Sequence, residues 1–163
     1  MNVITNSVDM RLIQPLEFHL VEMMSWFSNE QELTNWSGPN FRYPFNLASF
    51  IEDLKLNKLS SFALVSNKSE FFAFGQYYKR LDRCHLGRLI VNPIFRGKGI
   101  ASELMSKLCE LGLGKLEVKE CSLFVLAHND SAIKAYKKFG FSFSDYPGDI
   151  PIDNCLYMVK SWN

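Results

Sequence analysis

The sequence predicts an α+β fold, in which helices flank a central mixed sheet that is mostly antiparallel. The first observation behind this prediction is a set of three apolar segments within residues 61–91, separated only by short polar turns. This arrangement is typical of an antiparallel meander. The second observation is a near-continuous apolar run at residues 121–127, which predicts a strand buried on both faces. Helical periodicity on either side of that run completes the pattern.

Length and composition set the broad class. A chain of 163 residues is long enough for one domain with a proper core, so we expect a single domain over residues 1–163. The content of 47% hydrophobic and 21% charged residues is ordinary for a soluble globular protein. The formal net charge of only +1 does not provide the strongly basic character that binds nucleic acid, so we do not expect nucleic acid as a main partner. No apolar run is long enough to span a membrane, and the N-terminus carries no signal-peptide pattern.

The four cysteines are scattered, without C-x-x-C spacing, in apolar surroundings. They are typical of small core residues in a reducing compartment, which predicts a cytoplasmic location. No cluster of His, Cys or acidic residues has the spacing of metal ligands, so we expect no metal.

The first third of the chain is the less regular part. Residues 9–14 predict a short strand, Pro15 suits the start of a helix, and a further helix is expected from residue 46 to about 57. The segment between them, residues 26–50, is rich in aromatic side chains and broken by glycine and proline. Two interpretations stay open for it: a wall of a substrate pocket, or a loop that covers the core.

The rest of the chain predicts alternating elements. One of these elements is a helix that ends at Gly140, and Asn129 or Asp130 is expected to cap its start. In order, the predicted elements are strands at 61–66, 70–79 and 84–91, a helix of about 15 residues from Gly97, a strand at 121–127, a helix up to Gly140, and strands from 141 and at 155–160.

The turn at residues 96–99 is the strongest chemical signal. It lies between a strand, stopped by Pro93, and a helix, so it faces the unpaired N–H groups and the positive dipole of a helix start. Gly97 and Gly99 allow close approach of a ligand, and Arg96 and Lys98 add positive charge. The turn therefore predicts a site for a phosphate or pyrophosphate.

Three phosphate-binding patterns compete for this turn, beside the plain alternative of a glycine turn before an ordinary helix. A Walker A loop fails, because Asn92 and Gly99 stand where it needs Gly and Ser or Thr. A dinucleotide fingerprint lacks its third glycine, which is Ser102 here. The third pattern, Arg/Gln-x-x-Gly-x-Gly/Ala, is satisfied by Arg96, Gly99 and Ala101.

A second motif follows at residues 129–141 and reads Asn-x-x-Ala-x-x-x-Tyr-x-x-x-Gly-Phe. The two motifs in this order resemble the GNAT superfamily of N-acetyltransferases. The resemblance covers residues 60–160 well, whereas the first 60 residues match only in the order of their elements. It implies a GNAT-like fold whose sheet is splayed between the fourth and fifth strands, that is, between residues 84–91 and 121–127.

The resemblance also implies how acetyl-coenzyme A binds. The backbone of Leu89, Ile90 and Val91 would pair with the pantetheine arm like an added strand. Asn129 would hydrogen-bond the arm near the splay, and Tyr136 would lie beside the thioester sulfur as a proton donor. The pyrophosphate would be held at residues 96–101, which are Arg96, Gly97, Lys98, Gly99, Ile100 and Ala101.

The general base is the point where the chain departs from the family pattern. Family members carry a glutamate at one of two strand positions, which are His85 and Phe124 here. His85 is a candidate base, because an ordinary histidine pKa near 6.5 suits proton abstraction. The alternative is a strand histidine that serves only as a hydrogen-bond partner or faces solvent.

The sequence thus predicts direct transfer of an acetyl group from acetyl-coenzyme A to a primary amine, carried by a small molecule or a peptide. The protein would act as a monomer or homodimer. Two alternatives remain: a non-catalytic coenzyme A-binding sensor or assembly protein of the same fold, and a nicotinamide-dependent enzyme.

Overall fold

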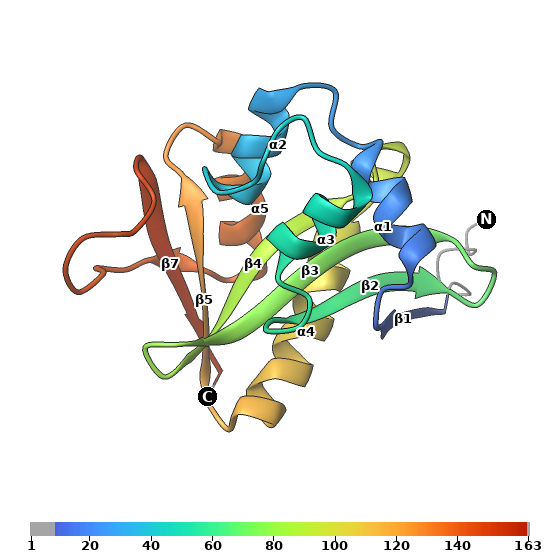
Figure 1. The fold of residues 1–163 in the computed structure, drawn as a ribbon. Coiled ribbons are helices and arrows are strands. Elements are labelled where there is room, and N and C mark those ends of the chain that lie inside the picture. Colours follow the sequence, from blue (N-terminus) through green and yellow to red (C-terminus); the bar gives the residue numbers. More distant parts are fainter. Residues whose placement is uncertain (1–8, 163) are drawn as a thin grey trace.

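The computed structural model describes residues 9–162, which form one seven-stranded sheet with helices on both faces (Figure 1). The strands lie side by side in the order β1-β2-β3-β4-β5-β7-β6. In chain order the elements are β1 (Met10–Ile13), α1 (Glu17–Met24), α2 (Glu30–Ser37), α3 (Leu47–Leu54), β2 (Ser60–Ser66), β3 (Phe71–Arg80), β4 (Arg83–Val91), the 3₁₀ helix η2 (Pro93–Phe95), α4 (Ile100–Leu116), β5 (Glu120–Leu126), α5 (Asp130–Phe139), β6 (Ser142–Phe143) and β7 (Cys155–Ser161).

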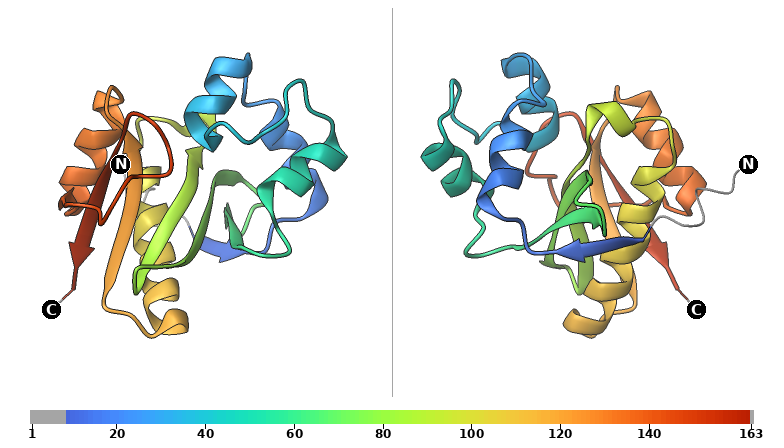
Figure 2. Two further views of the ribbon diagram at one scale, coloured as in Figure 1. Left: turned by 60° about the vertical axis from the view of Figure 1, so that its left-hand side comes forward. Right: turned by 90° about the vertical axis from the view of Figure 1, so that its right-hand side faces the viewer.

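The two faces of the sheet carry separate hydrophobic cores. Helices α4 and α5 cover one face, and α1, α2 and α3 cover the other (Figure 2). Leu104 and Leu108 of α4 pack with Leu86 and Leu123 of the sheet in the first core. Phe50 and Leu54 of α3 pack with Phe74 of β3 in the second. Because both faces are covered, the central strands are apolar on both sides.

Asparagine side chains start three of the helices. The side-chain oxygens of Asn29, Asn46 and Asn129 accept hydrogen bonds from the backbone N–H groups three residues ahead, at 2.9, 2.8 and 3.3 Å. Each bond satisfies one of the unpaired donors at a helix start. The prediction of Asn129 or Asp130 as a cap is therefore resolved in favour of Asn129.

Strands β2, β3 and β4 form the predicted antiparallel meander. One irregularity interrupts it: Phe74 pairs with Ile90 and Gln76 with Gly87, so β4 holds one residue more than β3 between these pairs. This β-bulge falls at Arg88, whose φ is +49°. A bulge turns an additional side chain toward one face of the sheet.

Strands β4 and β5 are parallel neighbours over a short distance only. They pair at Cys84–Cys121, His85–Ser122 and Leu86–Leu123, and among the described residues no pairing joins their further ends. Figure 1 shows the two strands together at their lower ends and apart above. The splay predicted between the fourth and fifth strands is present.

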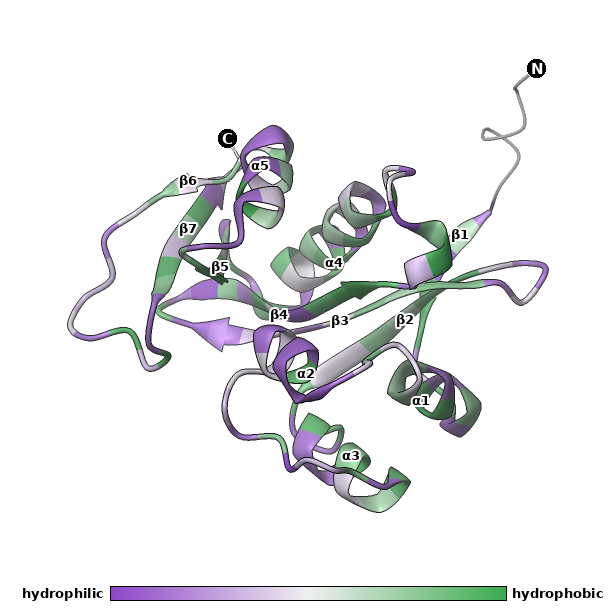
Figure 3. Cartoon of the chain, turned by 90° about the horizontal axis from the view of Figure 1, so that it is seen from above, coloured by the Kyte–Doolittle hydropathy of each residue, from purple (hydrophilic) through white to green (hydrophobic). Residues whose placement is uncertain are grey.

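The fold class is confirmed, with one helix that the sequence analysis did not delimit. Helix α2 lies inside the segment that was expected to be irregular, and most of it is hydrophilic (Figure 3). Leu33 and Ser37 are its buried residues, which is too few for a visible apolar stripe. The remaining elements agree with the prediction to within a few residues at their ends, and the helix expected from Gly97 begins at Ile100.

Two glycines of α4 test the packing of this helix on the sheet. A Cβ at Gly112 would overlap the Sγ atom of buried Cys84, whereas nothing lies within 4 Å of a Cβ at Gly114. Both changes to alanine favour the helix by about 1 kcal/mol, but overpacking costs about 1–3 kcal/mol. We expect Gly114→Ala to unfold at higher urea concentration than the wild type, and Gly112→Ala at lower. Equal midpoints for the two variants would contradict this packing.

Candidate active site

A cleft of about 1130 Å³ opens where β4 and β5 diverge. Its floor is formed by both strands, and its walls by α2, by the start of α5 and by the loop before β7. The cleft lies at the gap between these two strands, where α2 lines it from one face of the sheet and α5 from the other. Of the two interpretations of the aromatic segment 26–50, the structure supports the pocket wall, since Trp26, Phe27 and Trp36 line the cleft. Trp36 and Phe27 also pack in the second core, so this segment does both.

The glycine turn stands beside this cleft, between η2 and α4. Gly97 and Gly99 have φ values of +78° and +79°, and nothing lies within 4 Å of a Cβ at either residue. Arg96 and Lys98 are exposed, whereas Ile100 is buried and anchors the helix start. The hydrogen bonds of the described residues include none from the backbone N–H groups of residues 97–101. The turn therefore presents free donors and positive charge to an anion.

Asn92, which the sequence analysis did not assign, fixes the end of β4 before this turn. Its side-chain N–H groups donate to the Phe71 carbonyl oxygen at 2.9 Å and to Glu22 of α1 at 3.1 Å. Its side-chain oxygen accepts from the Ile94 N–H group at 3.2 Å. Asn92 is 4% exposed, so these bonds are protected from water. They tie the turn to both β3 and α1.

The backbone of β4 beyond Leu86 has an open edge toward β5. Leu89 and Val91 pack against the core under α4, and Ile90 packs against the opposite core. With these side chains held on the two faces, the N–H and C=O groups on the open edge lie in the plane of the sheet. The structure thus places Leu89, Ile90 and Val91 as an extended segment without a neighbouring strand on that side.

Asn129 and Tyr136 line the same cleft from α5. The Asn129 side-chain oxygen is used for capping, which leaves its N–H₂ group available to a ligand. Tyr136 is half-buried, and desolvation raises its pKa to about 12. The hydroxyl therefore keeps its proton throughout the physiological pH range. Of the predicted site residues, Arg96 from the first motif and Asn129 and Tyr136 from the second line this cleft, whereas residues 97–101 are not part of its lining.

His85 lies at the floor of the cleft and is only 2% exposed. Its Nδ1 atom lies 2.8 Å from the Ser122 hydroxyl oxygen, and the ring packs against Phe124 at a centroid distance of 4.5 Å. Burial, with a smaller contribution from the nearby Arg80 cation, lowers the pKa of His85 to about 3. Its imidazole is thus neutral at physiological pH and a much weaker base than an ordinary histidine.

Cys155 is a thiol of the cleft lining, and burial raises its pKa. A hydrogen bond with Cys121 and burial raise the pKa of Cys84, and a hydrogen bond with Cys109 raises the pKa of Cys121. These thiols stay protonated, and a thiol reacts as its thiolate. Across residues 9–162, no three His, Cys, Asp or Glu side chains form a group that could hold a metal ion, and no helix is both long and apolar enough to span a bilayer.

Among the polar residues of the cleft lining that were not predicted from the sequence are Gln76 and Arg88. No motif marks them, because their position depends on the bulge in β4. Helix α2 did carry a local signal. Asn29 caps the helix by accepting a hydrogen bond from the Glu32 N–H group, and the Glu32 carboxylate accepts one from the Ser28 N–H group at 2.6 Å. This Asn-x-x-Glu spacing is a capping-box pattern.

Comparison with known proteins places this geometry among acetyltransferases. The profile described as "Acetyltransferase (GNAT) family" matches residues 30–141. The structure of spermidine N-acetyltransferase from Vibrio cholerae with CoA and spermine is 15% identical, with a TM-score of 0.70 over 93% of this chain and 95% of that chain. An aminoglycoside acetyltransferase with coenzyme A is 19% identical, with a TM-score of 0.72 over 94% and 95%. The PaiA N-acetyltransferase of Thermoplasma acidophilum with coenzyme A is 16% identical, with a TM-score of 0.66 over 94% and 99%.

The buried His85 predicts how stability depends on pH. Its pKa is lowered from 6.5 to about 3 by folding, so below about pH 6.5 the unfolded chain binds a proton that the folded chain excludes. The free energy of unfolding should therefore fall with decreasing pH, by up to about 1.4 kcal/mol per pH unit from this residue.

We expect His85→Gln to show a shallower fall than the wild type between pH 6.5 and 4.5, in urea unfolding followed at each pH. Glutamine keeps a partner for Ser122 but does not titrate. His19, whose pKa is also lowered by burial, remains in both proteins and does not affect the difference. The same slope in both proteins would show that His85 is not held neutral by the fold.

Proposed function

We propose, from the premise that this chain belongs to the GNAT family of acetyltransferases, that it transfers the acetyl group of acetyl-coenzyme A directly to a primary amine. The observation that carries the proposal is the limited pairing of β4 with β5. It leaves an extended open edge that runs from the cleft to a helix start rich in free N–H donors. An elongated thioester with a pyrophosphate at one end fits such a path.

In this proposal the backbone of Leu89, Ile90 and Val91 pairs with the pantetheine arm as an added strand. The N–H groups of residues 97–101 hold the pyrophosphate, and Arg96 and Lys98 supply charge. Asn129 donates its free N–H₂ group to the arm. The family profile and the fold support this arrangement, since both belong to acetyltransferases.

The chemistry needs few protein groups. The neutral amine attacks the thioester carbonyl carbon, a backbone N–H group near Val91 stabilises the oxyanion, and the carbon–sulfur bond breaks. Tyr136, protonated because of its raised pKa, gives a proton to the departing thiolate. The ammonium that forms on the acceptor loses its proton to solvent, and Tyr136 regains one from solvent, which restores the balance of charge. No cysteine intermediate is required.

His85 is proposed to act in its neutral form, as the acceptor of a hydrogen bond from the amine or from a water that carries its proton away. With a pKa near 3, it is too weak a base to hold that proton, so the proton passes on to solvent. An acid limb of kcat/KM between pH 6 and 9 then reports the acceptor amine rather than His85.

The acceptor in this proposal is a small-molecule amine or a peptide amine. We further propose a single domain over residues 1–163, a monomer or homodimer as the working unit, and the cytoplasm as its location. Scattered cysteines in apolar surroundings support the reducing compartment.

One observation favours a second candidate, a coenzyme A-binding sensor without turnover: the base position holds a buried histidine of low pKa. Mixing the protein with acetyl-coenzyme A and a panel of amines, and following free thiol, separates the two. Thiol release that depends on an amine supports the enzyme. Binding of acetyl-coenzyme A without release on any amine supports the sensor.

The pyrophosphate site is tested by Gly99→Val with Gly148→Val as the matched control. Both glycines have positive φ, at +79° and +83°, with nothing within 4 Å of a Cβ, so both substitutions carry similar backbone strain. Only Gly99 stands at the helix start. We expect Gly99→Val to weaken acetyl-coenzyme A binding by about 10- to 100-fold in calorimetric titration, the value of one or two charge-assisted hydrogen bonds. Equal affinity in the two folded variants would overturn the assignment.

The proton donor is tested by Tyr136→Phe, which removes the hydroxyl and keeps the ring. A thiolate leaves without help at neutral pH, so the expected loss in kcat is modest, about 10- to 100-fold, with acetyl-coenzyme A affinity nearly unchanged. Tyr43→Phe, at an exposed tyrosine outside the cleft, is the control. Full kcat in Tyr136→Phe at saturating amine would make Tyr136 a packing residue.

A further inference from the structure

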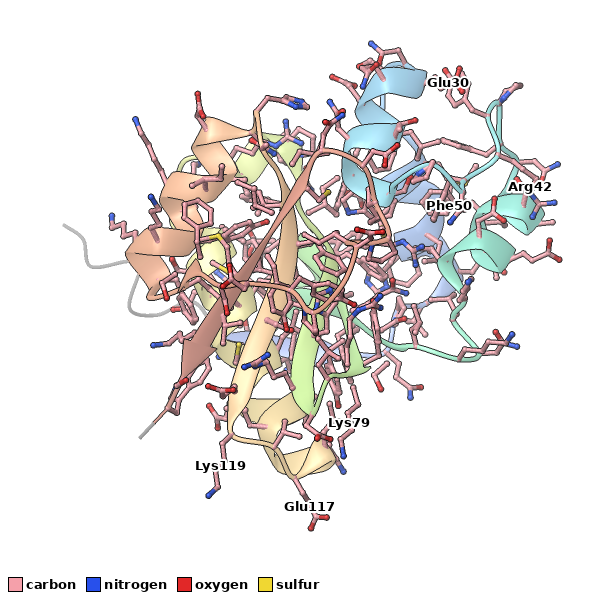
Figure 4. The ribbon with its side chains drawn as sticks, turned by 90° about the vertical axis from the view of Figure 1, so that its left-hand side faces the viewer. Glu30, Arg42, Phe50, Lys79, Glu117 and Lys119 are labelled. Carbon is pink, nitrogen blue, oxygen red and sulfur yellow. The ribbon has the colours of Figure 1, made fainter. Side chains whose placement is uncertain are left out.

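Arg88 is a cation of the cleft that forms no ion pair with a carboxylate of the described residues. Its guanidinium donates to the side-chain oxygen of Gln76 at 3.1 Å and lies over the Phe41 ring, 5.0 Å from the centroid. Asp53 is the acidic group whose charge reaches it, but the Asp53 carboxylate is already bound by Arg42 at 2.9 and 3.1 Å. Figure 4 shows Arg42 on the outer side of the helical layer, beside α3.

The fold holds the Arg88 guanidinium in place, although burying its charge is unfavourable. This burial lowers the pKa of Arg88, but the side chain stays charged. Gln76 is 1% exposed, and its own N–H₂ group donates to the Leu54 carbonyl at 2.8 Å and to the Ser61 hydroxyl at 2.9 Å. These two bonds fix the Gln76 oxygen toward Arg88. The bulge in β4 turns Arg88 onto this face, next to Gln76.

A guanidinium carries five N–H donors in a planar fork, and one protein bond uses only part of them. Arg88 lines the same cleft as His85 and Tyr136, where in the proposed function the acceptor amine meets the thioester. The acidic residues of the cleft lining, Glu32 and Asp153, are both exposed at its rim. The interior thus offers a desolvated positive charge where an acceptor that is only a cation would be repelled.

We propose that Arg88 binds a carboxylate of the acceptor, so that the substrate is an amine that also carries a carboxylate. This inference rests on the proposed function and adds the substrate class. Arg88 lies three residues beyond His85 in β4, so their Cα atoms are at most about 10 Å apart. One small molecule can therefore reach both the reacting end of the cleft and the guanidinium. A free amino acid and a short peptide with a free C-terminus share this chemistry.

The test uses pairs of amines that differ only in the carboxylate: lysine and cadaverine, ornithine and putrescine, phenylalanine and phenethylamine. Amine-dependent thiol release gives kcat/KM for each. We expect the wild type to prefer the carboxylate member by tenfold or more. Arg88→Met should lower kcat/KM for that member by about 10- to 100-fold and leave the other within about threefold. Arg88→Lys keeps the charge but lacks the planar guanidinium, so its kcat/KM for the carboxylate member should lie between those of the wild type and Arg88→Met.

Arg11→Met is the control for loss of one positive charge, because Arg11 is exposed on β1. Its preference should equal that of the wild type. Triglycine and its C-terminal amide, measured alongside, decide between free amino acids and peptides as the source of the carboxylate. Calorimetric titration of the same pairs into coenzyme A-saturated protein gives a second readout that does not require turnover, and it serves if Arg88→Met does not fold, because the wild-type preference alone then decides.

The inference is overturned if the wild type uses or binds the carboxylate-free amines equally well or better. It is also overturned if Arg88→Met lowers kcat/KM equally for both members of a pair, or if it weakens the binding of acetyl-coenzyme A instead. In those cases thiol release from simple amines still supports the proposed function. Failure of acetyl-coenzyme A to bind at all would instead contradict the proposed function itself.

Discussion

The short parallel contact between β4 and β5 is the constraint on which the rest of the site depends. Three residue pairs hold the two strands together at one end, and the long helix α4 connects them across one face of the sheet. Beyond Leu86 and Leu123 the strands separate, while β4 stays paired with β3 and β5 with β7. An open edge inside a sheet is otherwise a liability, since its backbone groups lack partners. A ligand that pairs with this edge resolves that liability.

The bulge in β4 is the second feature that shapes the site, and its packing depends on the residues of β3 opposite to it. A Cβ at Gly75 would lie 2.6 Å from Leu108 and 2.9 Å from Leu89, so glycine there lets α4 and the bulged strand approach β3 closely. On the other face the same bulge presents Arg88 to Gln76. Gly75 and the bulge beside it therefore act on the two faces of the sheet: Gly75 permits the close packing of α4, and the bulge presents a charged group to the cleft.

Local patterns in the sequence were enough for most of the fold and for part of the site. The glycine turn and the Asn129–Tyr136 motif are contiguous, so their geometry follows from turn and helix rules. Arg88 and Gln76 could not be found in this way, because a bulge is set by register between strands and leaves no fixed local signature. The state of His85 was equally hidden. Its ordinary pKa follows from the residue type, whereas its lowered pKa follows from burial, to which Phe124 and Tyr157 of strands far along the chain contribute, and from the charge of Arg80.

Desolvation leaves His85, Tyr136 and Arg88 of the cleft in different protonation states. It keeps His85 neutral, keeps Tyr136 protonated, and leaves Arg88 charged because a guanidinium does not lose its proton near neutral pH. Neither His85 nor Tyr136 changes its protonation between about pH 5 and 9, so neither can act as a titrating base there. The acceptor amine is then the group whose proton must be lost before attack. Within the proposal, a carboxylate bound at the Arg88 guanidinium would retain the substrate while its neutral amine attacks. Arg88 would thus select the acceptor, and the loss of the amine's proton would set the pH dependence of the reaction.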